Sequence, residues 1–295
     1  MMRRQQQMDN KLSSLSLYLR SWARHEVFVT LASRDALARS GVGGDREAEL
    51  FGTTLVELSA DGALHGAPHG GSAVDVIVND DALTCRFPYD YPDRARRGTL
   101  NDAFLRPEPF AIRLAAALEP LGETARLVVL RSAPLYVTEE MGFDAFLDRI
   151  DRFLAALPPS HRYALEPVGA LCLRQEYFAC LHARGVVHVF SEGETLFRPL
   201  PPVSDQLAVP GAFDGPFCVV RTIRDEGMPG MRWPVPNVAF RRQGWCNAVR
   251  RSLAEHVPVH LFADDETDPL RSVMTFMEMM NEDLAQRSVI RSNAA

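Results

Sequence analysis

The sequence predicts an α/β fold, and more specifically a TIM-type (β/α)8 barrel that is irregular in its N-terminal third. Short apolar runs alternate with helical segments from Arg126 to Phe190, which is typical of βαβ units that build a parallel sheet. Eight strand candidates with interspersed helices in 295 residues also suit a closed barrel. An open doubly wound sheet is the alternative. No Gly-x-Gly-x-x-Gly motif follows a strand, so nothing favours a dinucleotide site.

The helix predicted over residues 143–157 shows the clearest pattern. Its large apolar residues recur every three or four positions and its charged residues occupy the other side, as in a helix with one buried face. Pro158 and Pro159 end it, because proline has no N–H to donate and clashes with the preceding turn. A second helix is predicted over residues 173–185, and the flanking strands over 126–130, 162–166 and 186–190.

The other elements are predicted from shorter patterns. The remaining strands are expected at residues 26–32, 54–58, 82–87, 216–223 and 257–263. The run at 74–78 suits either a strand or a short helix. Further helices are expected at 109–118, at 246–256 and from about Pro269, with a short one ending at Gly52 and an irregular segment at 224–245.

Composition narrows the class of protein. We expect one domain over residues 26–295, preceded by a tail with a short helix over residues 1–25. The hydrophobic share is 46% and the charged share 24%, as in an ordinary globular protein. The formal net charge of −6 provides no overall basic field, so nucleic acid is not the expected partner. Lys11 is the only lysine, which argues against a Schiff-base or P-loop mechanism.

Cysteine usage and hydropathy predict a cytoplasmic protein. The five cysteines are scattered without a Cys-x-x-Cys pair, which suits a reducing compartment better than secretion. No apolar run reaches the roughly 18–20 residues that a membrane span needs, and the N-terminal residues lack the features of a signal peptide. We therefore expect no membrane partner. The sequence does not indicate the oligomeric state.

Four sequence segments together point to a known family. They are NDAFLRPEPF at residues 101–110, FDAFLDRIDRFLAALPPSHRYALE at 143–166, EYFACLHARGVVHVF at 176–190 and VPGAFDGPFCVVR at 209–221. With them the chain resembles the YecE-like family, also called domain of unknown function 72, over residues 83–262. The resemblance implies a TIM-barrel fold. The activity of the family is not settled, so the resemblance implies no particular reaction.

The resemblance also implies which polar strand residues line a site. The family's polar positions at the second, third, fifth, seventh and eighth strands correspond here to Glu57, Arg86, Glu166, Arg221, and the pair Asp264 and Asp265. One departure is that the family's first-strand Thr-Ser-Gly-Trp is replaced by TLASRD at residues 30–35.

Such residues would gather at one end of the molecule, because the carboxyl ends of barrel strands converge on the active site. There they could bind a small polar or anionic molecule, since arginine binds carboxylate and phosphate bidentately. Glu166 is the candidate catalytic acid or base of a hydrolase or lyase. The assigned roles are orientation for Glu57 and ligand binding for Arg86, Arg221, Asp264 and Asp265.

Other interpretations of these residues stay open, including whether the protein is an enzyme at all. An inward-facing layer of ion pairs could simply fill the barrel, because interior acids need basic partners whatever the function. A non-catalytic barrel used for binding or assembly is a second hypothesis. A nucleic-acid processing barrel is a third, by analogy of fold.

We predict no cofactor and no metal. The acidic run that begins at Asp264 could bind a divalent cation, but Asp268 before Pro269 is better explained as a helix cap. His65 and His69 lie in a loop where their spacing defines no shared face. His188 and His260 fall inside strands and are expected to be core histidines. Arginines at 241, 242, 250 and 251 with interleaved aromatics are better explained as a solvated surface than as a nucleic-acid site.

Overall fold

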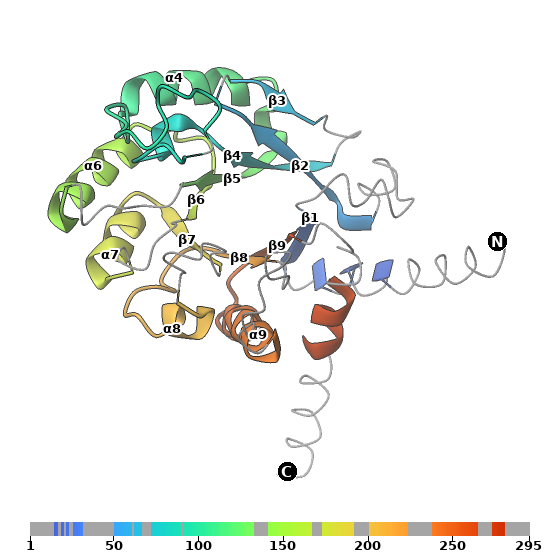
Figure 1. Ribbon diagram of the computed structural model, residues 1–295. Coiled ribbons are helices and arrows are strands. Elements are labelled where there is room, and N and C mark those ends of the chain that lie inside the picture. The colour runs from blue at the N-terminus through green and yellow to red at the C-terminus, as the bar shows by residue number, and fades with distance from the viewer. Residues whose placement is uncertain are drawn as a thin grey trace, which may run out of the picture.

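The computed structural model shows a mixed α/β protein built on one curled sheet (Figure 1). It describes residues 15–16, 19–20, 22–23, 26–31, 50–60, 62–66, 72–89, 91–132, 141–166, 173–191, 201–223, 238–264 and 273–280. For residues 223, 238–242 and 264 the description covers the backbone and not the side chains.

The described residues form one sheet of nine strands. They are β1 (Val27–Leu31), β2 (Thr53–Leu58), β3 (Leu64–His65), β4 (Ala73–Val78), β5 (Ala125–Arg131), β6 (Tyr163–Glu166), β7 (Val186–Phe190), β8 (Cys218–Ile223) and β9 (Val259–Asp264). Their order is β1-β9-β8-β7-β6-β5-β4-β2-β3. Neighbouring strands pair in parallel, except that the short β3 runs antiparallel to β2.

Helices follow the parallel strands along the chain. They are η1 (Asp81–Leu83), α4 (Pro107–Leu118), η2 (Gly122–Thr124), α6 (Phe143–Ala155), α7 (Gln175–Ala183), α8 (Val203–Leu207) and α9 (Val238–Glu255), with a further helical stretch at 273–280. The long helices all lie on the outer side of the curled sheet (Figure 1). This arrangement differs from an open doubly wound sheet, which carries helices on both faces. In the part of the chain that is described, no helix is both long and apolar enough to cross a membrane.

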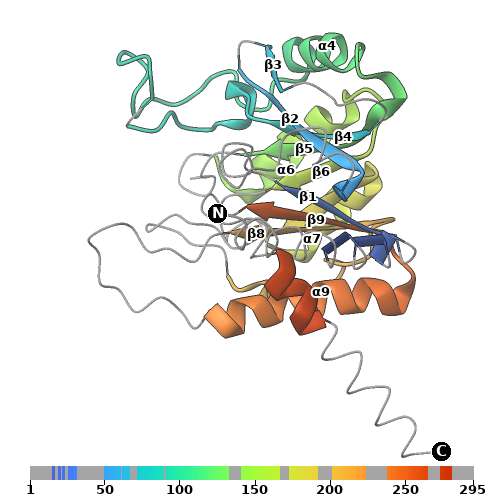
Figure 2. The same cartoon turned by 90° about the vertical axis from the view of Figure 1, so that its right-hand side faces the viewer.

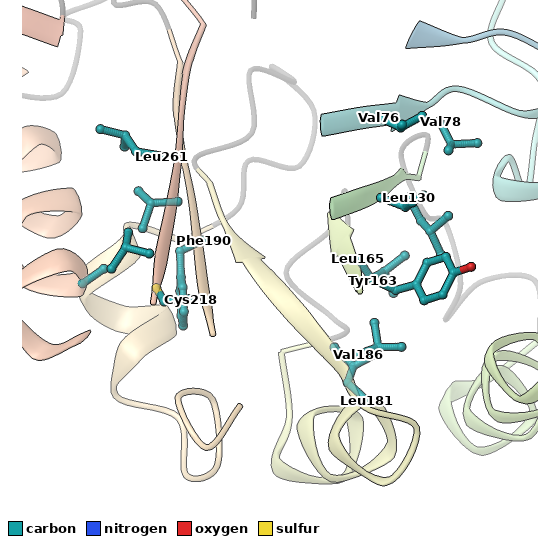
Figure 3. Packing of buried hydrophobic residues seen from close by; sticks show 14 of the residues in the cluster. Val76, Val78, Leu130, Tyr163, Leu165, Leu181, Val186, Phe190, Cys218 and Leu261 are labelled. Carbon is teal, nitrogen blue, oxygen red and sulfur yellow. The ribbon is translucent and has the colours of Figure 1, made fainter. Parts of the chain in front are cut away.

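Strand residues alternate between two hydrophobic layers. Side chains such as Val76, Leu130 and Leu165 face the helices and join the larger core cluster (Figure 3). The residues that alternate with them, among them Val129 and Ala164, point to the inside of the curl and form a second, smaller cluster. Both faces of the sheet thus carry buried apolar side chains, which explains why its strands are near-continuous apolar runs.

The predicted α/β class with a parallel sheet is confirmed, and seven of the eight predicted strands lie where the sequence placed them. The strand predicted at 82–87 is wrong. The third parallel strand is instead β4, in the run that the pattern left undecided. Asp80 accepts a hydrogen bond from the Ala82 N–H at 2.7 Å and so begins the short helix η1. Beyond it, Arg86 makes an isolated bridge to Leu100, outside the sheet.

A second correction concerns α9. It begins at Val238, within the segment that the sequence predicted to be irregular up to Trp245. Its inner side chains are buried, including Trp245, Cys246 and Val249. Packing against β8 and β9 thus extends a helix whose apolar periodicity is weak at its start, because tertiary burial supplies most of the stability of a helix.

A buried polar cluster joins β1 to β2, although the described residues show no backbone ladder between these strands. The Thr53 hydroxyl donates to the Val29 carbonyl at 3.0 Å and lies 3.0 Å from the Thr30 hydroxyl. Thr30 in turn donates to Asp75 Oδ2 at 2.6 Å. Arg126 completes the cluster with two hydrogen bonds to the Asp75 carboxylate, at 2.5 and 3.0 Å. We call these four side chains the seam cluster.

An irregularity of the sheet turns Arg126 inward. Val74 pairs with Ala125 but Asp75 pairs with Leu127, so Arg126 is an extra residue in β5. A bulge of this kind re-aims a side chain, and it brings the guanidinium to the buried carboxylate. The same guanidinium lies 4.6 Å from the centre of the Phe28 ring.

Two buried histidines are neutral parts of the core, as the sequence predicts. His188 Nε2 donates to Gln206 Oε1 at 3.0 Å, because the Gln206 amide N–H groups are used by the carbonyls of Ser191 and Pro201. This contact fastens α8 to β7. His260 lies inside the curl between the rings of Phe28 and Phe217. Burial lowers the pKa of each histidine to about 4.

The seam cluster predicts a large penalty for Asp75→Asn. The substitution leaves the Arg126 charge inside the sheet without its carboxylate, and breaking a buried pair costs about 3–5 kcal/mol. Urea unfolding followed by circular dichroism measures the loss. Asp151→Asn is the matched control, since its pair with Arg184 lies on the helix surface and should be worth about 0–1 kcal/mol. Equal, small losses in the two variants would show that the seam cluster does not hold β1 to β2.

The histidines predict a loss of stability in mild acid. Their folded-state pKa values of about 4 lie below the ordinary 6.5. Between pH 4 and 6.5 the unfolded chain therefore binds more protons than the folded protein. Stability is therefore full above pH 6.5 and falls as the pH drops toward 4, by about 3 kcal/mol for each histidine.

Urea midpoints at pH 7, 6, 5 and 4.5 test this dependence. Carboxylates also contribute to acid unfolding, so the informative quantity is the difference between the wild type and His188→Asn. The variant should have the flatter profile. Parallel profiles would contradict the assignment of a buried neutral imidazole at this position.

Candidate functional site

The candidate site lies at the carboxyl ends of β5, β6 and β8, and β7 lies between β6 and β8 in the sheet. Arg131 ends β5 and pairs in register with Glu166, which ends β6. Arg221 lies near the end of β8. These three positions continue the alternation of the inward-facing Val129, Ala164 and Val219, so the strand period of two brings their side chains to the same side of the sheet.

Glu166 and Arg221 form a buried ion pair at this end. Arg221 Nη1 lies 2.6 Å from Glu166 Oε1, and the two side chains are 5% and 4% exposed. Arg131 Nε lies 3.7 Å from the other oxygen, Oε2, and its side chain is 39% exposed. Glu166 therefore lies between a buried arginine and one that reaches solvent.

The distances at the centre of this group leave polar atoms of Arg131 and Glu166 that could bind a ligand. A separation of 3.7 Å is too long for a hydrogen bond, so Arg131 contacts Glu166 by charge alone. Among the described residues, Glu166 Oε2 is buried and accepts no hydrogen bond. The three charges sum to +1. A guanidinium with unused donors beside a buried acceptor can bind an oxyanion bidentately. We call Arg131, Glu166 and Arg221 the mouth cluster.

Glu57, the other predicted catalytic residue, lies on the inward-facing alternation of β2. It is exposed, and it accepts a hydrogen bond from Asn79 Nδ2 at 2.6 Å. Asn79 directly follows β4, the neighbouring strand. No described hydrogen bond or ion pair connects this pair to the mouth cluster. Glu57 is thus at a strand end, as expected, with a partner that the sequence did not suggest.

The other predicted site residues are placed less centrally. The Arg86 guanidinium donates to the Gly98 carbonyl within the segment 79–106, which extends past the end of the sheet (Figure 2). Arg86 is therefore not on a strand, contrary to the prediction. Asp264 is the last residue of β9, and its side chain lies outside the description. Asp265 and the rest of the acidic run also lie outside it.

The remaining candidates for chemistry have ordinary surroundings. His65 is exposed on β3 and lies 3.1 Å from the Ser59 hydroxyl, whereas His69 lies outside the described residues. Arg251 pairs with Glu255 one turn along α9 at 2.9 Å, and Arg250 donates to Asn247. The side chains of residues 241 and 242 are not described. Within the described ranges, no three His, Cys, Asp or Glu side chains are grouped as a metal would need.

Arg131, Asn79 and Ser191 escaped sequence reasoning. Arg131 was left just beyond its predicted strand, yet it lies two residues after the inward-facing Val129. Ser191 follows the inward-facing Val189 in the same way, and its hydroxyl is buried without a hydrogen bond among the described residues. Extending the alternation of each strand by two residues would have found all three.

The buried pair predicts unequal costs at the mouth cluster. Glu166→Gln removes the carboxylate that balances the buried Arg221 charge, which costs about 3–5 kcal/mol. Arg131→Gln removes a half-exposed charge at 3.7 Å and should cost no more than about 1 kcal/mol. Urea unfolding of the two variants measures both. A Glu166→Gln protein as stable as the wild type would mean that Arg221 does not depend on this carboxylate.

Comparisons with known proteins support the fold. No family model matches the sequence, and no curated protein matches it. Among solved structures, a DUF72 family protein from Thermotoga maritima is similar with a TM-score of 0.54 and 9% sequence identity, over 88% of this chain and 99% of that protein. The likeness is one of fold, and it agrees with the resemblance to the YecE-like family that the sequence motifs indicate.

Proposed function

We propose that this protein is a YecE-like barrel that binds a small anionic ligand at the carboxyl ends of its strands. The mouth cluster is the observation that carries the proposal. Its three charges sum to +1, and Arg131 combines exposure with donors that no described residue uses. Arginine is suited to this role because its fork of N–H groups matches the oxygens of a carboxylate or phosphate.

The barrel itself belongs to the proposal. The seam cluster supports closure between β1 and β2, because Thr53 donates to the backbone carbonyl of Val29 across the two strands. A closed ring would direct the strand ends toward a common mouth. Glu57 with Asn79 would then border the same ligand, and Asp264 and Asp265 remain proposed ligand-binding residues of the chain segment at the end of β9. Arg86 has no part in it, because its guanidinium is engaged with Gly98.

Glu166 has two roles in this proposal. Its Oε1 holds Arg221, which fixes the position of that guanidinium. If the protein is a hydrolase or lyase, Oε2 is the atom that would exchange a proton with the ligand, since Oε1 is already occupied.

Titration calorimetry with inorganic phosphate, succinate and tricarballylate tests the binding. Arg131→Gln should weaken the affinity about tenfold or more, because a hydrogen bond to a charged group contributes about 1.5–3 kcal/mol. Arg184→Gln is the matched control, being an arginine of similar exposure that pairs with Asp151 on the outer helices. It should bind as the wild type does. Equal affinities of all three proteins, or no binding by the wild type, would refute the proposal.

A further inference from the structure

We propose that the ligand of the mouth cluster is a small hydroxylated anion, in which a hydroxyl lies next to the carboxylate or phosphate. A 2-hydroxycarboxylate is the simplest such molecule. The inference rests on the proposed function and specifies its ligand class. It comes from the atoms that the mouth cluster leaves without hydrogen bonds.

The first of these atoms is Glu166 Oε2. The side chain is 4% exposed, and Oε2 accepts no hydrogen bond among the described residues. A buried acceptor without a donor costs about 1–3 kcal/mol. A plain carboxylate cannot remove this cost, because its ionised oxygen placed beside Oε2 would repel it. A hydroxyl can, because it donates a proton to Oε2.

The second requirement is that the hydroxyl lies close to the anionic group. Arg131 Nε lies 3.7 Å from Glu166 Oε2. A ligand that binds the guanidinium of Arg131 with its anionic oxygens and also donates to Oε2 must bridge this short gap. A hydroxyl on the adjacent carbon meets that condition. A hydroxyl several carbons away from the anionic group would fit only if Arg131 and Glu166 Oε2 were farther apart.

The charge of the mouth cluster favours a hydroxyl over an ammonium group as the donor. Two arginines and one glutamate sum to +1. A hydroxy acid offsets the positive charge of the cluster with its anionic groups. The amino acid of the same skeleton has one negative charge fewer, as aspartate has beside malate, and it adds an ammonium beside two guanidinium groups. Like charges at close range are destabilising where water is excluded.

Ser191 provides a further contact on the strand between Glu166 and Arg221. It directly follows β7, is 1% exposed, and its hydroxyl has no hydrogen bond among the described residues. A serine hydroxyl both donates and accepts, so it suits the same mixed ligand.

Matched pairs of compounds that differ by one hydroxyl test the inference on the wild-type protein. The pairs are citrate with tricarballylate, and each enantiomer of malate with succinate. We expect citrate and one malate enantiomer to bind about tenfold more tightly than their deoxy partners, as for one hydrogen bond to a charged group. Aspartate, with an ammonium in place of the hydroxyl, should bind more weakly than that malate enantiomer.

Two variants assign the effect to its atoms. Arg131→Gln should weaken both members of each pair by the same factor and leave their ratio unchanged. Glu166→Gln, checked for folding by circular dichroism, should reduce the ratio toward one, because an amide accepts more weakly than a carboxylate. If this variant does not fold, the wild-type ratios and those of Arg131→Gln still decide the question.

The outcomes separate the two proposals. Binding that depends on Arg131 but does not distinguish the hydroxylated from the deoxy compounds would overturn the hydroxy-acid inference and leave the anion site standing. Tighter binding of aspartate than of both malate enantiomers would overturn it in favour of an amino-acid ligand. If the wild type binds no compound of the set, both proposals fail.

Discussion

The fold depends on a carboxylate and a guanidinium buried on the inside of the curled sheet. The Asp75 side chain is fully buried and that of Arg126 is 16% exposed, and unpaired buried charges would oppose folding by several kcal/mol. They are tolerated because the bulge in β5 brings them together and because Thr30 donates to the same carboxylate. Since the threonines of this cluster come from β1 and β2, the pair also holds the first strand of the sheet beside β2.

The inside of the sheet is polar at both ends and apolar between them. Leu55, Leu127, Val129 and Phe262 belong to the dry layer that separates the seam cluster from the mouth cluster. Two groups of charges divided by hydrocarbon must each be balanced locally, because attraction across such a layer weakens with distance. The seam cluster has one acid for one base and is complete. Among the described residues the mouth cluster has one acid for two bases, and the buried Glu166 Oε2 beside Arg131 is the physical basis for assigning a ligand to it.

The errors of sequence reasoning have specific causes. Residues 82–87 resemble a strand in composition, but Asp80 caps a short helix that begins there. The strand is β4, just before this helix. Its pattern was ambiguous because Asp75 interrupts the apolar run. Arg86 is a predicted site residue because the resemblance matches it to the family's third strand, whereas here it lies outside the sheet. Arg131 was missed for the opposite reason, since a charged residue at the end of an apolar run looks like the start of a loop.

The sequence by itself determined the alternation of strands and helices, the outward-facing polar sides of the helices and the presence of Glu166 and Arg221 near strand ends. These follow from local periodicity, prolines and caps, which act over a few residues. The partners of the buried charges were decided only by the tertiary structure. Asp75 meets Arg126 across 51 residues and Glu166 meets Arg221 across 55, because the curl of the sheet sets which inward-facing side chains share a level.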